Sequence, residues 1–358
     1  MEKGELARLR MHSQRIVGSG LVEPLDLVTW MGAIQAQDYE MAKWAIALRL
    51  LEGRRGAVEA AIDRAQILRT HVLRPTWHLV AAADLRWILD LSAPRLKASL
   101  AGRQRQLGLT APLLSRSYAV IERSLAASGQ LSRDELIEAL GEAGIPTEGG
   151  RASHIFVMAE LEGLVCSGSN GGRLTRYALL DERVPAAPKL DRDEALSRLA
   201  RRYLASRGPA TSEDFAWWSG LGLREARRGL SSLGSELEEL EVEGRSYLAL
   251  PSDQPKTEAN RELRLLPAFD EYLIAYTDRE AAIAREEQRK AISENGIFRP
   301  IIIVDGLVVG LWKRVAGKAG ASIESELFIR PTKPVTRALN EEIEKYRRYY
   351  QAASGRGV

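Results

Sequence analysis

Two glutamines stand one residue apart near the start of the chain, in the stretch IQAQDY at residues 34–39. An ordered glutamine loses side-chain entropy, and a buried one needs hydrogen-bond partners for its amide. Gln35 and Gln37 are therefore candidates for holding a polar ligand. The simpler alternative is a helix end at which both amides bond to loose backbone groups. Asp38 could act as a general base, but its place before the helical stretch YEMAKWAIAL favours a role as helix N-cap.

A second group of polar residues lies in QILRTHVLRPTWHLV at residues 66–80, which we expect to form a β-hairpin. Alternation along a strand that is regular across Pro75 would place Arg74, Thr76 and His78 on one face. Thr76 and His78 are candidates for contacting a ligand. A polar strand face is more often solvated than catalytic, and a hairpin histidine is more often a local hydrogen-bond partner, so both interpretations stay open.

The remaining sequence carries none of the familiar signatures of enzymes. It has no phosphate-cradling loop, no GxSxG, no HExxH and no dinucleotide fingerprint. The one cysteine and four histidines lack metal-ligand spacing, so we expect neither a disulfide framework nor a zinc site, and no cofactor. No stretch approaches the roughly eighteen apolar residues of a membrane span, and the N-terminus lacks the apolar core of a signal peptide. We therefore expect a cytoplasmic protein without membrane association.

An internal repeat organises most of the chain. Its copies lie at residues 127–145, 205–223 and, more weakly, 18–34. Ser132 with Glu135, and Thr211 with Asp214, resemble capping boxes that open a helix in the two clearer copies. In each copy helical segments flank this helix and a hairpin pattern follows, which is the order of a winged helix.

The composition changes after Pro251. The polar run SDQPKTEANRE indicates a linker. Strand-type runs follow in LRLLPAFDEYLIAY, RPIIIVDGLVVGLWKR and IESELFIR, with Asp305-Gly306 as a hairpin turn, and the helix TRALNEEIEKYRRYY closes the chain. We therefore expect a mainly α protein with β structure (the α+β class). Its expected domains are winged-helix units at residues 1–108, 109–188 and 189–251, and a β-rich module with a helix at 262–358.

The charge balance permits an anionic partner without requiring one. The net charge is only +3, yet the fifty-one Lys and Arg are mostly Arg, which suits bidentate phosphate contacts. A nucleic-acid surface must therefore come from clustering. Solvated helix faces explain most basic runs, but closeness to the glutamines favours phosphate contact. The candidates are Arg54, Arg55, Arg69, Arg74, Arg103, Arg299, Lys313 and Arg314.

Four separated segments carry a family resemblance: GAIQAQDY, LRTHVLRPTWHLV, LLPAFDEYLIAYTDR and NGIFRPIIIVDGLVVGLWKR. Together they resemble the winged-helix DNA-binding-domain family that contains the AlkZ-like and YcaQ-type DNA glycosylases, over essentially the whole chain. In that family the first motif is glutamine, an apolar residue, then glutamine or aspartate. Gln35-Ala36-Gln37 is similar to the two-glutamine AlkZ branch.

The resemblance implies three winged helices in a C shape around a basic channel, with Gln35 and Gln37 at its centre. It implies a monofunctional DNA glycosylase, expected as a nucleoid-associated monomer, that acts on double-stranded DNA. The implied substrates are purines alkylated at N7 or N3, including interstrand crosslinks made by a genotoxic natural product, in self-resistance or in repair. Asp38, Thr76 and His78 become candidates for catalysis or lesion contact.

The implied chemistry suits two amides. A purine alkylated at N7 or N3 is already cationic and leaves easily, so the enzyme mainly has to place a water and stabilise an oxocarbenium-like sugar. Amide oxygens could aim that water at C1′. A base tethered to the opposite strand cannot rotate into a deep pocket, so crosslink removal also predicts an open groove beside the glutamines.

The main alternative is a non-catalytic winged-helix transcriptional regulator. Such a protein would place a helix rich in base-reading side chains in the major groove. The corresponding stretch of the middle copy, GRASHIFVMAELEGLV, is too apolar for that role. A structural protein that reuses winged helices is a further alternative.

Two residue pairs outside the glutamine motif have expected places. Asp270 and Glu271 could line the channel or serve in a turn. We expect Trp217 and Trp218 to lie in the core.

Overall fold

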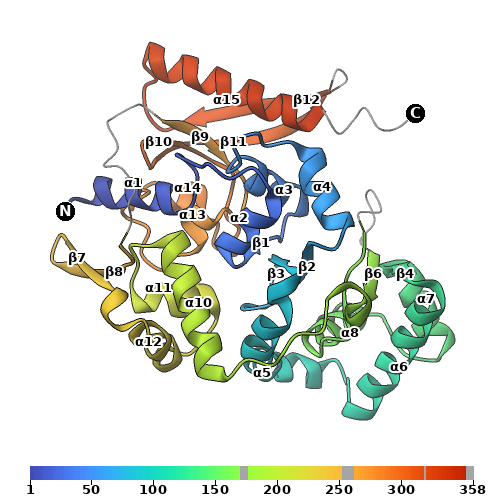
Figure 1. The fold of residues 1–358 in the computed structure, drawn as a ribbon. Helices are drawn as coiled ribbons and strands as arrows, with labels where there is room; N and C mark the ends of the chain where they lie inside the picture. Colours follow the sequence, from blue (N-terminus) through green and yellow to red (C-terminus); the bar gives the residue numbers. More distant parts are fainter. Residues whose placement is uncertain (170–175, 252–261, 318–319, 352–358) are drawn as a thin grey trace. The chain divides into compact units, whose positions relative to one another are not determined.

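The computed structural model describes residues 1–169, 176–251, 262–317 and 320–351 (Figure 1). Helices alternate with small antiparallel sheets, so the α+β class is confirmed. The predicted linker after Pro251 falls on residues 252–261, which lie outside the described residues. Contacts divide the chain into two compact units. The first comprises Met1–Val58, Leu196–Trp218 and Gly222–Val358; the second comprises Glu59–Ala195 and Ser219–Leu221.

The first unit contains both ends of the described chain. Its helices are α1 (Lys3–Ser13), α2 (Pro24–Met31), α3 (Tyr39–Ala47), the start of α4 (Arg55–Asp63), most of α10 (Arg192–Arg207) and α11 (Ser212–Ser219), α12 (Leu223–Ser231), α13 (Glu271–Ile274), α14 (Gln288–Ala291) and α15 (Lys333–Gln351). Its strands are β1 (Ile34–Gln35), β7 (Glu238–Val242), β8 (Arg245–Ala249), β9 (Leu263–Leu266), β10 (Ile301–Val304), β11 (Leu307–Gly317) and β12 (Gly320–Leu327).

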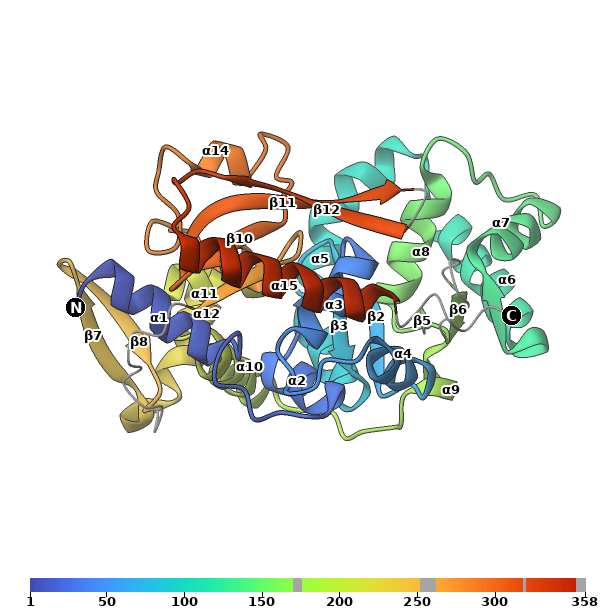
Figure 2. The same cartoon turned by 90° about the horizontal axis from the view of Figure 1, so that it is seen from above.

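The four C-terminal strands form an antiparallel sheet in the order β12-β11-β10-β9. The predicted turn at Asp305-Gly306 is confirmed: Val304 pairs with Leu307, and φ is 50° at Asp305 and 87° at Gly306. The predicted closing helix is α15, which lies along this sheet in both ribbon views (Figures 1 and 2).

Aromatic side chains join the C-terminal sheet to α3 and α15. The indole N–H of Trp44, on α3, donates to Leu265 O of β9 at 2.9 Å. The indole N–H of Trp312, on β11, donates to Leu266 O at 2.8 Å. The ring of Tyr346 on α15 packs against both indoles, with centroids 5.1 Å and 4.8 Å away. This packing fixes α3, which directly follows the glutamine motif.

Two details of the first unit differ from the sequence expectations. The run LRLLPAFDEYLIAY is a strand only as far as Leu266, because Asp270 caps the helical turn α13 through Tyr272 N–H at 2.9 Å. Of the tryptophan pair, Trp218 is fully buried, whereas Trp217 is 45% exposed and donates its indole N–H to Ile274 O. The core assignment is therefore right for Trp218 and wrong for Trp217.

The second unit holds the rest of the helices and two small sheets. Its helices are α5 (Ala82–Gln106), α6 (Ala111–Ser128), α7 (Arg133–Glu142), α8 (Arg151–Leu161) and α9 (Leu180–Arg183). Its strands are β2 (Ile67–His71) and β3 (Trp77–Ala81), which form an antiparallel hairpin, and β4 (Gln130–Ser132), β5 (Val165–Ser167) and β6 (Arg176–Leu179), which form a sheet in the order β4-β6-β5.

The predicted helix starts of the repeat are confirmed. Ser132 and Glu135 form a reciprocal capping box at the start of α7. Thr211 and Asp214 make the same exchange at the start of α11, each bond 3.1 Å long. Helices and a hairpin follow one another in each copy as expected, while the winged-helix packing and the four-domain division stay predictions. No helix of the described residues is long and apolar enough to span a membrane.

Candidate active site

The glutamine motif lies in the short link between α2 and α3. Gly32 ends α2 with a φ of 71°, and Gln35 closes the two-residue strand β1. Gln35 is only 5% exposed, whereas Gln37 is exposed. Asp38 accepts the N–H of Met41 at 3.1 Å, so its predicted role as the N-cap of α3 is confirmed. The link thus carries two amide side chains two positions apart, one buried and one exposed.

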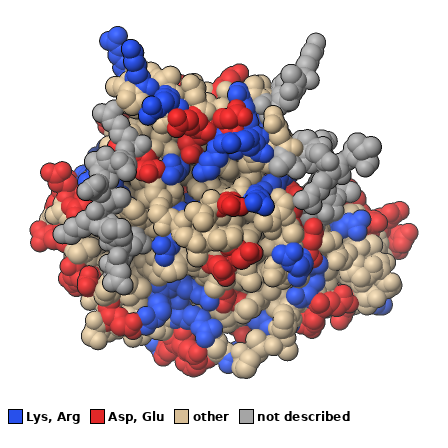
Figure 3. Space-filling view, turned by 45° about the horizontal axis from the view of Figure 1, so that its top comes forward, with Lys and Arg blue, Asp and Glu red and all other residues tan. Residues whose placement is uncertain are grey.

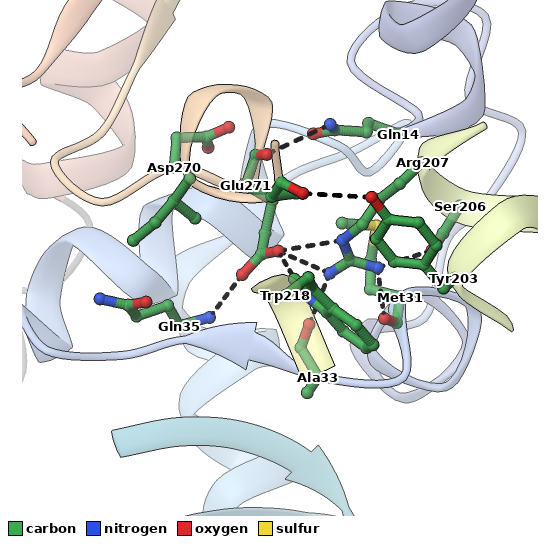
Figure 4. A network of polar contacts seen from close by, with 12 residues as sticks. Gln14, Met31, Ala33, Gln35, Tyr203, Ser206, Arg207, Trp218, Asp270 and Glu271 are labelled. Carbon is green, nitrogen blue, oxygen red and sulfur yellow. Dashed lines mark hydrogen bonds and ion pairs between the residues drawn. The ribbon is translucent and has the colours of Figure 1, made fainter. Parts of the chain in front are cut away.

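A buried ion pair holds the backbone of this link (Figure 4). Glu271 Oε1 accepts the backbone N–H of Gln35 at 2.8 Å. Glu271 Oε2 accepts from Arg207 Nε at 3.0 Å, from Arg207 Nη2 at 2.7 Å and from the indole N–H of Trp218 at 2.9 Å. Arg207 also donates to the carbonyls of Met31 and Ala33, both at 2.7 Å. Figure 4 shows the Gln35 side chain pointing away from the Glu271 carboxylate.

Two buried tyrosines donate hydrogen bonds to the backbone near this ion pair. Burial raises the pKa of Tyr203 and of Tyr276, so both phenols stay protonated and serve as hydrogen-bond donors. Tyr276 donates to Arg207 O at 2.8 Å, and Tyr203 donates to Ala275 O at 3.1 Å. The phenols therefore fix the ends of α10 and α13, the helices that carry the arginine and the glutamate.

The neighbouring carboxylate holds the chain beyond α3. Asp270 takes a bidentate ion pair from Arg49, at 2.9 Å and 2.7 Å, and both side chains are at most 2% exposed. Arg49 also donates to the carbonyls of Gln14 and Ala45, both at 2.9 Å. Asp270 and Glu271 are thus buried structural groups: Glu271 holds the link between α2 and α3, Asp270 holds the chain after α3, and neither is exposed enough to line a channel.

The hairpin in the second unit departs from the predicted alternation. The hairpin itself is confirmed, with Thr70 opposite His78, but β2 ends at His71 and β3 starts at Trp77. The intervening residues turn sharply: φ is 60° at Leu73, and the N–H of Arg74 donates to Val72 O at 2.6 Å. The strand is therefore not regular across Pro75, which was the condition for placing Arg74, Thr76 and His78 on one face; proline supplies no N–H and restricts the residue before it.

His78 is fully buried, and its Nδ1 lies 2.9 Å from Thr76 O, a local contact of the kind that the simpler interpretation expects. On β2, His71 Nδ1 lies 2.6 Å from the buried carboxylate of Glu160, which also accepts from Thr70 Oγ1 at 3.2 Å. A lesion-contacting role of Thr76 and His78 stays a prediction. Gln35 belongs to the first unit and His78 to the second.

The eight basic candidates differ in their surroundings. Exposed side chains belong to Arg54, Arg103, Arg299 and Lys313; half-buried ones to Arg55, Arg74 and Arg314; and a buried one to Arg69. Several face acidic neighbours, as Arg55 does with Glu40 at 2.6 Å and Lys313 with Glu324 at 2.8 Å. Figure 3 shows basic and acidic side chains mixed over the face that it presents. Phosphate contact by these residues stays a prediction.

The large cavity of the first unit does not adjoin the glutamine motif. A cavity of about 690 Å³ in the first unit is lined by His12, Trp30 and Leu240, among others, and by neither Gln35 nor Gln37. Within the ranges that the structure describes, no three His, Cys, Asp or Glu side chains are grouped to hold a metal ion.

Arg207 could not be singled out from the sequence. It stands in RRYLASRGPA, where nothing distinguishes it from neighbouring arginines. Glu271 had a weak signal, because it lies in LLPAFDEYLIAYTDR, one of the four segments that carry the family resemblance.

Comparison with known proteins gives consistent results. Residues 28–349 match the family described as DNA glycosylase AlkZ-like. The chain is 27% identical over 348 residues to the interstrand DNA cross-link repair glycosylase of Streptomyces sahachiroi, covering 92% of this chain and 90% of that protein. The solved structure of Streptomyces sahachiroi DNA glycosylase AlkZ shares the fold, with a TM-score of 0.80, 24% identity, and 98% and 96% of the two chains covered. The family match favours an enzyme over a transcriptional regulator, and the chain belongs to the AlkZ-like family of DNA glycosylases, which hydrolyse N-glycosyl bonds in DNA.

Proposed function

We propose that this glycosylase excises purines alkylated at N7 or N3 from double-stranded DNA and unhooks interstrand crosslinks formed through such positions. The family assignment supports this substrate class, as does the similarity to the interstrand DNA cross-link repair glycosylase of Streptomyces sahachiroi. The structural observation that carries the proposal is the glutamine link: Gln35 is buried on a backbone fixed by Glu271, and Gln37 is exposed beside it.

In the proposed reaction, amide oxygens of Gln35 and Gln37 accept hydrogen bonds from one water and orient its lone pair toward C1′. The water oxygen bonds to C1′ as the glycosidic C1′–N bond breaks. The bonding electron pair leaves with the base and neutralises its positive charge, and the proton of the water passes to solvent. Amides add position and little basicity, so an undamaged neutral base reacts poorly.

We also propose that the protein acts as a monomer on chromosomal DNA, in self-resistance or in general repair. The half-buried hairpin residues Arg74 and Thr76 contact the duplex near the lesion, the buried His78 holds Thr76 O through its Nδ1, and the damaged base is reached in an open groove. Exposed arginines and Lys313 supply phosphate contacts.

The test uses two duplexes, one with N7-methylguanine and one with a crosslink through guanine N7. Free base and unhooked strand are measured in single turnover, and affinity is measured by electrophoretic shift. We expect Gln35→Ala and Gln37→Ala each to lose roughly 100-fold or more in rate while affinity changes little, since positioning acts on the transition state.

Asp38→Asn is the discriminating control. Asparagine retains an N-cap oxygen but removes the carboxylate, so we expect near-normal excision. A large loss in this variant would make Asp38 the general base. Normal rates in both glutamine variants would end the water-holding proposal, and sequence-specific binding to undamaged DNA without base release would favour the regulator.

A further inference from the structure

Three backbone groups of the link between α2 and α3 share an unusual set of partners. Ala33 O and the N–H of Gln35 flank Ile34 in β1 and therefore lie on one edge of this extended segment, while Met31 O is the last carbonyl of α2, before the turn at Gly32. An adjacent strand normally satisfies such an edge. Here the Arg207 guanidinium takes both carbonyls and the Glu271 carboxylate takes the N–H, so a side-chain ion pair does what a strand would do.

The pair is saturated with hydrogen bonds on both sides. Glu271 accepts four, from Gln35, from two nitrogens of Arg207 and from Trp218. Arg207 uses its remaining donors on the two carbonyls and on Ser206 Oγ, at 2.6 Å. Both charged side chains are at most 1% exposed. A fully satisfied buried network is rigid, and this one ties two carbonyls and one N–H of the backbone to fixed partners, so it specifies one geometry of the chain around Gln35.

We propose that Glu271 and Arg207 are positioning residues for base excision. They set the backbone of Gln35, and through it the direction of the amide that holds the water, without touching the amide themselves. The inference rests on the proposed water-holding role of the glutamines. It adds that the geometry of this role is imposed by residues from two distant segments of the chain.

The expected loss of excision rate follows from the sensitivity of a catalytic group to small displacements. A displacement of about 1 Å at a catalytic group can cost roughly 100-fold in rate. In Glu271→Gln, the single amide oxygen can face either Gln35 or Arg207 and Trp218, and the NH₂ group then meets a donor on the other side. In Arg207→Lys, the charge stays but one ammonium cannot span two carbonyls and a carboxylate. We expect both variants to lose 10- to 100-fold in single-turnover rate.

The experiment compares these variants with Asp270→Asn at a temperature where each is folded. Asp270 is a matched control: it is the adjacent buried carboxylate, pairs with an arginine, and bonds to no group between Met31 and Gln35. Excision of N7-methylguanine, DNA affinity and amide hydrogen exchange of the peptide covering residues 31–37 are measured for all three. Gln35→Ala is measured alongside.

The inference holds if Glu271→Gln and Arg207→Lys lose at least tenfold more rate than Asp270→Asn, bind DNA within threefold of wild type, and exchange the Gln35 amide faster. It is overturned if the rates of all three variants fall equally, or if exchange at Gln35 rises while excision stays normal. A normal rate in Gln35→Ala would instead remove the Gln35 amide from the proposed water-holding role on which the inference rests, so the two failures are distinguishable.

Discussion

Loss of the Asp270 carboxylate should destabilise the first unit far more than loss of an exposed carboxylate. Asp270→Ala leaves the Arg49 guanidinium buried and without its bidentate partner, a change that costs about 3–5 kcal/mol. It also removes the cap of α13, for about 1 kcal/mol more. The total of about 4–6 kcal/mol is a large part of the usual 5–15 kcal/mol of stability. At roughly 2–4 °C per kcal/mol, the melting temperature should fall by about 8–24 °C.

This loss of stability is measured from thermal melts followed by circular dichroism, for wild type, Asp270→Ala, Arg49→Met and the double variant. If the pair acts as described, the double variant loses at least about 2 kcal/mol less than the sum of the single losses, because it leaves no unpaired charge. Glu236→Ala is the surface control, since its partner Arg201 is also exposed, and it should shift the melt by no more than about 2 °C. A shift under about 3 °C for Asp270→Ala, or additive single losses, would refute the reasoning.

Three further predictions concern binding, pH and packing. If Arg299, which is exposed, contacts phosphate, Arg299→Ala should reduce the slope of log affinity against log salt by about 1, and an unchanged slope would remove it from the interface. Burial and, secondarily, the charge of Arg103 lower the pKa of His154 in the folded protein, so the unfolded chain takes up a proton more readily than the folded one. The free energy of unfolding should therefore fall as the pH drops below about 6.5. His154→Gln should reduce this dependence of the melting temperature on pH between pH 7 and 5. Gly306→Ala should cost about 2–4 kcal/mol, because φ is 87° and a Cβ would lie 2.9 Å from a side chain of α1, whereas Gly244→Ala, with similar φ and open space, should cost about 1 kcal/mol; equal losses in a denaturant titration would contradict this.

Local chemistry explains what the sequence predicted well. Capping boxes, the Asp305-Gly306 turn and the N-cap at Asp38 each depend on residues within four positions, and all are found in the structure. The glutamine motif could be singled out because two amides in an apolar context are unusual. The alternation of side chains along a strand does not continue across Pro75, because the residues between His71 and Trp77 form a turn and Pro75 has no N–H for strand pairing.

The parts that could not be predicted depend on long-range contacts. Glu271 and Asp270 are adjacent carboxylates, yet one bonds to Gln35 and the other to Arg49, and no local rule assigns those partners. Trp217 and Trp218 are likewise adjacent, and only the packing decides which of them is buried. The sequence therefore singles out candidate groups for chemistry, but not the residues that hold the backbone around them.

The first unit is assembled from segments that are far apart in the chain, which has a consequence for synthesis. The ribosome releases both glutamines early, but Arg207 follows Ala33 by 174 positions and Glu271 follows Gln35 by 236. Until those segments emerge, the link between α2 and α3 lacks the partners of its backbone edge. A nascent or prematurely terminated chain would thus carry both glutamines without the geometry that we assign to them, so excision activity should arise only near the end of translation.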